Sequence, residues 1–380
     1  MSNNWANRSI ESLCLRVRSG GTPSRKRPEY FVEPNHAGAM PWLKTKELND
    51  TYLHATEEFI TRAAIAASSA KVLPQDTVVM AMYGATVGKL GILATEMTCN
   101  QAVCAMEVDP SQADPRFLFY RLLQDRPRLV GLATGSAQQN LSGTVIRNFK
   151  VACPPLDEQR RIAGVLGALD DLIEVNRRLM SELDELGLAL FRNAWDGQTW
   201  CSVSDLGTVT MGQSPPGSTY NEEGLGLVFY QGVRDFGSRY PTPRVHCTAA
   251  TRKAAAGDIL IAVRAPIGET NVAVEPTAIG RGLAALKASR PALTLRALRA
   301  TSLTWSVHEG NGTVFSSISG PDLRAAKVPS VTDDVLEVHL STLDQAHLAL
   351  AQEAAELEAT RNELLPLLMS GRVRVGDVAA

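Results

Sequence analysis

The chain has 380 residues, of which 44% are hydrophobic and 21% charged, with 38 basic and 40 acidic side chains. No apolar run approaches the roughly 18 residues of a transmembrane helix, so we expect a soluble globular protein without a membrane span. The amino-terminal residues MSNNWANRSIESLCL lack a basic region followed by an apolar core, which argues against a secretory signal.

The six cysteines show no spacing typical of a metal site. They stand at positions 14, 99, 104, 153, 201 and 247, with no CxxC motif and no regular spacing to the histidines. We therefore expect buried, unpaired cysteines in a reducing cytoplasm, and neither a metal nor a cofactor in this chain.

One segment of the sequence occurs twice. Residues 140–155 read NLSGTVIRNFKVACPP and residues 317–332 read SISGPDLRAAKVPSVT, which share the frame xxSGxxxRxxKV at an offset of 177 residues. Gly20-Gly-Thr-Pro also corresponds to Gly212-Gln-Ser-Pro, and the apolar strand after Asp76 corresponds to the strand after Asp258. A period far longer than that of a solenoid repeat predicts two duplicated α/β domains.

A long amphipathic helix is expected after each copy of this segment. In the first helix a heptad seam runs through Ile162, Leu166, Leu169, Ile173, Asn176, Met180, Leu183 and Leu190, with Gly187 leaving a hole. In the second, leucines recur every seven residues at Leu336, Leu343, Leu350, Leu357 and Leu364, and His347 and Arg361 interrupt the seam. Each helix either lies on its own domain or packs on the other, and the repeated heptads favour the pair. Asn176 either sets the register of the pair or lies at a helix edge.

Helix boundaries divide the chain into four predicted segments. Pro154-Pro155 precede the first helix, Asp196-Gly197 follow it, and Pro366 should end or kink the second. We therefore expect globular domains at 1–155 and 197–332, and helical segments of about 50 to 60 Å at 156–196 and 333–380. The predicted fold is α+β; if the two helices run antiparallel, a pseudo-twofold axis relates the two halves.

Charge follows the same division. The two globular segments each carry a net charge of +4, whereas the helical segments carry −4 and −6. Because basic surfaces attract phosphate, the globular domains are the parts expected to face nucleic acid.

The sequence lacks the motifs of an active site. Residues 84–89, GATVGK, resemble a phosphate loop but have three residues between the glycines where four are needed. No GxSxG, HExxH or dinucleotide-binding motif is present. We therefore expect a chain that is not an enzyme.

Several motifs resemble the specificity subunits of type I restriction-modification systems. They are Ser19-Gly-Gly-Thr-Pro23, Pro41-Trp-Leu-Lys-Thr-Lys46, the segment PPLDEQRRI ending at Ile162, Gly257-Asp-Ile-Leu-Ile261 and residues 364–374, LLPLLMSGRVR. In order, they cover nearly the whole chain. The second copy lacks the Pro-Pro and Glu-Gln of PPLDEQRRI, which leaves open whether the second helix contacts a partner as the first does.

The resemblance implies a non-catalytic, DNA-binding subunit. Such a subunit reads a bipartite, asymmetric target in double-stranded DNA and directs two methyltransferase subunits and the restriction subunits to it. S-adenosylmethionine and the adenine-methylating site then belong to the methyltransferase partner. Two other classes remain open: a DNA-binding adaptor outside restriction, and a coiled-coil interaction scaffold without a DNA role.

Candidate DNA-binding residues come from basic and amide-rich loops. In the first domain they are Arg25, Lys26, Arg27, Lys44, Lys46, Lys89, Gln138, Gln139 and Asn140, and in the second Arg234, Arg264, Arg281, Asn311 and Ser316. Asparagine and glutamine suit bidentate bonds to adenine, and arginine suits guanine or phosphate. The alternative for the basic loops is ordinary solvated charge.

Overall fold

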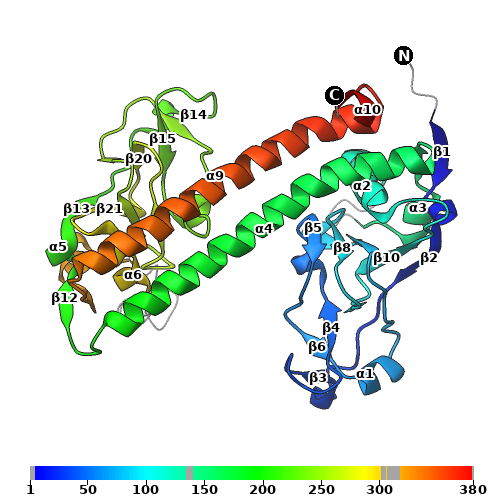
Figure 1. Cartoon of the computed structure of the whole chain (residues 1–380), viewed down its shortest axis with the longest axis horizontal. Helices are drawn as coiled ribbons and strands as arrows, with labels where there is room; N and C mark the ends of the chain where they lie inside the picture. Colours follow the sequence, from blue (N-terminus) through cyan, green and yellow to red (C-terminus); the bar gives the residue numbers. More distant parts are fainter. Residues whose placement is uncertain (1–4, 134–139, 301–304, 306–316, 379–380) are drawn as a thin grey trace. The chain divides into compact units, whose positions relative to one another are not determined.

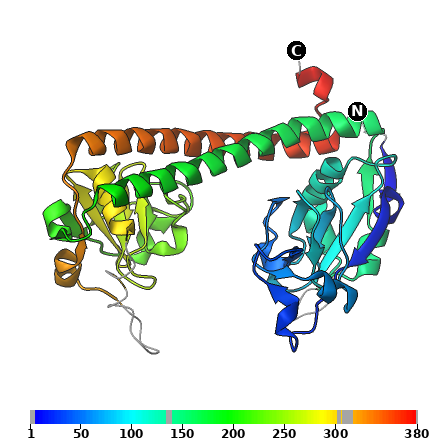
Figure 2. The same ribbon diagram turned by 60° about the horizontal axis from the view of Figure 1, so that its bottom comes forward.

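The computed structural model describes residues 5–133, 140–300, 305 and 317–378. Its contacts divide the chain into two compact units, the first formed by Met1–Val175 with Glu353–Ala380 and the second by Asn176–Gln352. Each unit combines a globular part with a section of both long helices (Figures 1 and 2). The predicted α+β class is confirmed, whereas the four segment boundaries and the pseudo-twofold relation stay predictions.

A five-stranded sheet forms the centre of the first unit. In spatial order its strands are β2 (Cys14–Ser19), β10 (Val103–Val108), β7 (Val78–Ala81), β8 (Leu90–Leu93) and β5 (Thr51–Leu53). Neighbours are antiparallel except β5 and β8. Helix α2 (Pro115–Val130) contributes Phe117 and Leu118 to the core cluster that holds Val78 and Met106 of the sheet. Strands β7 and β10 are buried along their whole length, and their side chains are apolar except for Glu107 of β10, which pairs with Arg18.

A smaller sheet lies at the end of the first unit remote from helix α4 (Figures 1 and 2). Its strands are β3 (Phe31–Val32), β6 (Phe59–Ile60), β4 (Met40–Leu43) and β9 (Thr98–Cys99), with helix α1 (Arg62–Ala66) beside them. A two-stranded ribbon of β1 (Ala6–Ser9) and β11 (Lys150–Cys153), with helix α3 (Gly143–Asn148), completes the globular part.

The second unit repeats this plan. Its main sheet has the order β13 (Gly207–Met211), β21 (Leu283–Ala288), β18 (Ile259–Ala262) and β19 (Thr270–Val272). A second sheet has the order β14 (Tyr220–Asn221), β16 (His246–Cys247), β15 (Leu227–Tyr230), β20 (Thr277–Ile279) and β17 (Lys253–Ala254). The ribbon is β12 (Trp200–Ser202) with β22 (Lys327–Pro329), and the helices are α5 (Val203–Leu206), α6 (Pro291–Arg299) and α8 (Gly320–Ala325).

The repeated SGxxxRxxKV segment performs the same structural task in both units. Ser142 caps α3 by accepting from the amide of Val145, and Ser319 caps α8 by accepting from the amide of Asp322. The arginine of each copy donates to a carbonyl of the first strand of the main sheet: Arg147 to Val17 at 2.9 Å and Arg324 to Val209 at 3.4 Å. The segment therefore fastens a capped helix to the main sheet in each unit, which accounts for its repetition.

A second repeated position, Gly20 and Gly212, requires glycine. A Cβ atom on Gly20 would lie 2.1 Å from the carbonyl oxygen of Cys99, and one on Gly212 would lie 2.1 Å from that of Gly280. Only glycine allows the chain to turn this close to the neighbouring strand.

The long helices are α4 (Leu156–Ala194) and α9 (Asp334–Ser370), and a short helix α10 (Val375–Val378) follows. Ile162, Leu166 and Ile173 are buried, and Leu169, Met180 and Leu183 are half-buried. Ile162 and Leu166 belong to one core cluster with the globular part and with Leu365 and Leu368 of α9. The helices therefore pack both on their globular parts and on each other, and both interpretations of the heptads hold.

Three details of the helices differ from the predictions. Leu190 is 37% exposed because the neighbouring Phe191 takes the fully buried position. Asn176 is 5% exposed, so it does not lie at a helix edge. Helix α9 does not end at Pro366 but continues to Ser370.

In α9 the most buried residues are not the leucines that recur every seven residues but others on the same side of the helix. The five leucines are half-buried: Leu336, Leu343, Leu350, Leu357 and Leu364. Leu340, His347, Ala354 and Leu368 are buried instead. The polar residue His347 therefore lies at the centre of the packed face of this helix.

Charged side chains join the helices to the first globular part. Asp170 of α4 accepts from Arg361 of α9 at 2.6 Å and from the hydroxyl of Tyr120 of α2 at 2.5 Å. The next residue, Asp171, pairs with Arg116 of α2 at 3.0 Å. Because Arg361 meets Asp170 while Leu368 lies with Ile162 and Leu166 in one cluster, the helix sections in this unit run antiparallel.

In the second unit a denser cluster of charged side chains joins the two helices to the globular part. Arg239, only 2% exposed, bridges Asp184 of α4 at 2.6 Å and Asp344 of α9. Arg296 of α6 also binds Asp344, at 2.5 Å, and its guanidinium occupies the space that a side chain on Gly187 would fill. The gap that Gly187 was predicted to leave in the heptad seam is therefore filled by the Arg296 guanidinium.

His347 stands beside this cluster and is held neutral. Burial, and after it the positive charge of Arg239, lower the pKa of His347, although Asp184 and Asp344 oppose this shift. Its Nε2 atom lies 3.7 Å from Asp184. The two contacts occupy equivalent positions of the repeat. Asp170 and His347 are 177 residues apart, as are Asp184 and Arg361, and Asp170 pairs with Arg361 while Asp184 lies beside His347.

The motif PPLDEQRRI has an internal role that the second copy fulfils differently. The buried Gln159 accepts from the amide of Asp114, the residue that caps α2, at 3.1 Å and donates to the carbonyl of Pro154 at 2.9 Å. In the second unit Glu337 accepts from the amides of Ala292 and Leu293 at the start of α6. The second copy lacks the Glu-Gln pair, and Glu337 of α9 performs the role that Gln159 performs in α4.

We predict that Arg239→Ala lowers the free energy of unfolding of the second unit by about 2 kcal/mol, because it removes a buried guanidinium and leaves two half-buried carboxylates one partner short. Arg290→Ala serves as the control, since Arg290 pairs with Asp334, which is 82% exposed. The control should lose less than about 1 kcal/mol. Urea unfolding followed by circular dichroism measures both, and equal losses would contradict a structural role for the cluster.

Candidate nucleic-acid interface

Exposed polar side chains gather at one end of the main sheet of the first unit. Ser19 of β2 lies opposite Cys104, and Ala81 of β7 lies opposite Val103, so the loops that follow β2 and β7 leave the sheet at the same end. At this end Thr22 donates to the side-chain oxygen of Gln101, and Tyr83 pairs with Asn140 in an isolated bridge. We call Thr22, Tyr83, Gln101 and Asn140 the polar edge of the first unit.

The second unit has a polar edge at the corresponding place. Met211 of β13 and Ile261 of β18 both lie opposite Ala284 of β21. In the loops beyond them the amide of Arg281 donates to Ser214 Oγ at 3.2 Å, and Arg264 pairs with Ser317 in an isolated bridge. Ser214, Arg264, Arg281 and Ser317 form the polar edge of the second unit, and Asn140 and Ser317 are again 177 residues apart.

A short 3-10 helix with basic residues adjoins each polar edge. In the first unit the amide of Asn100 donates to the carbonyl of Leu43, directly before the turn Thr45–Glu47 that carries Lys46. In the second unit the amide of Gly282 donates to the carbonyl of Gln231, shortly before the turn Val233–Asp235 that carries Arg234. The two units therefore place the predicted residues Lys46 and Arg234 in equivalent positions.

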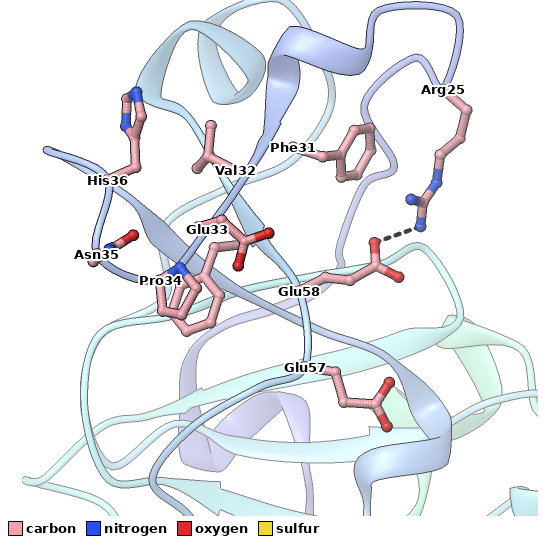
Figure 3. Close-up of a pocket in the computed structure, with 10 residues that line it drawn as sticks. Arg25, Phe31, Val32, Glu33, Pro34, Asn35, His36, Glu57 and Glu58 are labelled. Carbon is pink, nitrogen blue, oxygen red and sulfur yellow. Dashed lines mark hydrogen bonds and ion pairs between the residues drawn. The ribbon is translucent and has the colours of Figure 1, made fainter.

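Three basic residues of the first unit are paired with two carboxylates, and Figure 3 shows one of these pairs, Arg25 with Glu58. Glu58 binds Arg25 at 2.6 Å and Lys44 at 2.5 Å, and Glu57 binds Lys44 at 3.5 Å and also Lys46. We call Arg25, Glu58, Lys44, Glu57 and Lys46 the charge ladder, because the sign of the charge alternates along it. The guanidinium of Arg25 also lies 4.1 Å from the ring centre of Phe31.

The charge ladder borders an open groove of about 670 Å³ on the small sheet (Figure 3). Its lining includes Phe31, Phe59, Glu33, Glu57 and Glu58.

Electrostatics favours the charged forms of Lys44, Glu57 and Glu58. Burial lowers the pKa of Lys44, but bonds to Glu58 and Glu57 outweigh this effect and hold its pKa above the ordinary value. The bond from Lys46 lowers the pKa of Glu57, and Lys44 and Arg25 lower that of Glu58 against the opposing effect of burial. The ladder is thus a set of formed ion pairs.

The ladder rests on a rigid backbone. The carboxylate of Glu47 accepts from the amides of Lys44 and Glu57, both at 2.7 Å, and so ties together the two loops that carry the ladder. The indole of Trp42, which is 2% exposed, donates to the carbonyl of Gly21 at 3.0 Å and links strand β4 to the loop after β2. The ladder and the polar edge are therefore held in one framework.

The other predicted residues have separate environments. Lys26 is exposed, and Arg27 donates to the hydroxyl of Tyr30 at 3.2 Å. Lys89 pairs with Asp50 at 3.1 Å, and Asp50 also binds Arg126. Lys89 thus belongs to a local ion-pair group and not to the ladder.

Four predicted residues, Gln138, Gln139, Asn311 and Ser316, lie outside the described residues. Gln101 was not predicted, although its signal was present as a polar pair, Asn100-Gln101, between two short apolar strands.

Comparison with known proteins shows which family this chain resembles. Residues 2–185, slightly less than half of the chain, match the family described as type I restriction modification DNA specificity domain. The resemblance found in the sequence motifs is confirmed, because the relatives of the chain are specificity subunits of type I restriction enzymes.

Two relatives come from Methanocaldococcus jannaschii. The chain is 30% identical over 266 residues to a protein named as the MjaX type I restriction enzyme specificity subunit, covering 63% of this chain and 62% of that protein. It is 28% identical over 183 residues to the MjaIX specificity subunit, covering 47% and 40%. The chain thus aligns with less than two thirds of each of these relatives.

A solved structure shares the fold. The S subunit of a type I restriction-modification system from M. genitalium has a TM-score of 0.60 at 20% identity, covering 96% of both chains.

Within the described ranges, no helix of this protein is long and apolar enough to cross a membrane.

We predict that Lys44→Ala weakens DNA binding on all sequences and lowers the slope of log affinity against log salt by about one, because the charge ladder of three cations and two carboxylates then loses its one excess positive charge. The control is Lys150→Ala, whose exposed lysine lies on β11 opposite Ser9, at the other end of β2 from the polar edge. Fluorescence anisotropy with random-sequence duplex DNA at several salt concentrations measures both. An unchanged salt slope in Lys44→Ala, or an equally lowered slope in Lys150→Ala, would contradict the assignment of the charge ladder to the DNA-binding surface.

Proposed function

We propose that this chain is the DNA-sequence specificity subunit of a type I restriction-modification system. It reads a bipartite, asymmetric target in double-stranded DNA, with one unit on each half of the target. The observation that carries this proposal is the polar edge, which recurs at equivalent positions of two units built around the same repeated segment. The match of residues 2–185 to the type I restriction modification DNA specificity domain supports it independently.

The two polar edges suit different bases. Gln101 and Asn140 of the first unit present amides, which bond bidentately to the N6 and N7 atoms of adenine. Arg264 and Arg281 of the second unit present guanidinium groups, which match the O6 and N7 atoms of guanine. Such a chain reads two different half-sites, and a palindromic target is not expected.

Catalysis belongs to partner subunits in this proposal. A base in a duplex is methylated only after extrusion into an enclosed pocket that also holds the methyl donor. The groove beside the charge ladder is open and is lined by carboxylates and exposed loop residues. We therefore place S-adenosylmethionine and the methylated adenine in methyltransferase subunits, and DNA cleavage in restriction subunits, with all components in the cytoplasm.

The long helices offer a surface for those partners. In the second unit Leu179, Leu186 and Leu190 of α4 are 38%, 48% and 37% exposed, and their spacing of seven and four places them on one helix face. In the first unit Leu172 and Val175 of the same helix are 49% and 40% exposed. Exposed apolar residues at heptad spacing are typical of a face that packs on another helix, and two methyltransferase subunits are the proposed occupants.

Methylome sequencing of the host with and without this gene tests the proposal. We expect one bipartite methyladenine motif, with two different halves, to disappear when the gene is deleted and to return on complementation. An unchanged methylome in a host that expresses the methyltransferase subunit would contradict the proposal, and a DNA-binding adaptor or an interaction scaffold would remain.

A further inference from the structure

The two units differ in how their cations are neutralised. In the first unit the three basic residues of the charge ladder are already paired with Glu57 and Glu58. In the second unit Arg234, Arg264 and Arg281 are exposed, and none of them forms an ion pair with any residue that the structure describes. Asp235, the carboxylate next to Arg234, is buried and pairs with Arg244 instead.

Among the residues that the structure describes, the side chains of the two ladder carboxylates bind only the cations. The side-chain oxygens of Glu58 bind Arg25 and Lys44, and those of Glu57 bind Lys44 and Lys46. The loops themselves are held by Glu47 and by the backbone bond from Trp42 to Glu58. The framework of the site thus does not depend on the charges of Glu57 and Glu58, whereas its electrostatic potential does.

These carboxylates oppose phosphate binding at the place where it is expected. A phosphate that approaches Lys44 must displace or share the carboxylates of Glu57 and Glu58, and it also meets their negative charge. Non-specific DNA binding depends almost entirely on phosphate neutralisation, whereas specific binding adds contacts to base edges. Paired cations therefore weaken non-specific binding more than specific binding.

We propose that Glu57 and Glu58 are specificity-determining residues that restrain the first unit from binding non-target DNA. The inference rests on the proposed function. The second unit, whose three arginines form no ion pair with the residues that the structure describes, supplies most of the general attraction to DNA, and the first unit binds firmly only where its polar edge finds matching bases.

The test measures binding of the full chain to random-sequence duplex DNA between 50 and 200 mM salt. In Glu57→Gln/Glu58→Gln each amide keeps the shape and one acceptor oxygen of the carboxylate, and the loss of two negative charges releases about two positive charges. We expect tighter binding at 50 mM salt and a salt slope steeper by about two. The loss of affinity across this salt range should then be about tenfold greater than in the parent protein.

Glu96→Gln is the matched control, because it removes one carboxylate from an exposed loop of the same unit. Glu57→Gln alone provides a milder variant, since the Glu57 side chain is 55% exposed, and its slope should steepen by about one. Circular dichroism confirms that each variant is folded. A parent protein that binds no DNA at any salt concentration would overturn the proposed function, whereas a parent that binds DNA with the same slope as both ladder variants would overturn only this inference.

Discussion

Buried charge at the seam of the two long helices is the constraint on which each unit depends. A carboxylate of α4, Asp170 in one unit and Asp184 in the other, meets both a residue of α9 and a residue of the globular part. An apolar seam would tolerate sliding by a heptad, whereas a buried ion pair in the wrong register leaves charges unpaired. The globular part therefore stands at one defined position on its helices. In a protein that reads two half-sites, this position contributes to the distance between them.

The sequence predicts this architecture where its physical cause is periodic or repeated. The duplication, the helix starts and the basic globular parts follow from the SGxxxRxxKV segments, the heptads and the charge distribution. The seam register at Phe191 and the continuation of α9 through Pro366 were missed, because both are decided by tertiary packing. The partners of Arg25 and Lys44 were also missed, since Glu57 and Glu58 reach them only through folding of the small sheet. Whether any candidate residue touches DNA stays a prediction.

One scaffold thus carries two different chemistries. The same strand ends, glycine turns and capped helices present amides and an aromatic ring in one unit and guanidinium groups in the other. The roles that hold the scaffold are repeated even where the residue changes, as with Gln159 and Glu337. Apart from the corresponding hydroxyl residues Thr22 and Ser214, the residues that face solvent at the polar edges are not repeated. This separation is what a protein needs to change its target without changing its assembly.

The central claim is that each unit reads one half of a split target. Methylome sequencing of hosts that express either Gln101→Ala or Arg281→Ala, together with the partner subunits, tests it most directly. We predict that Gln101→Ala relaxes the base requirement at one position in one half of the motif, and that Arg281→Ala does so in the other half. Changes from both variants in the same half, or an unaltered motif in both, would contradict the account.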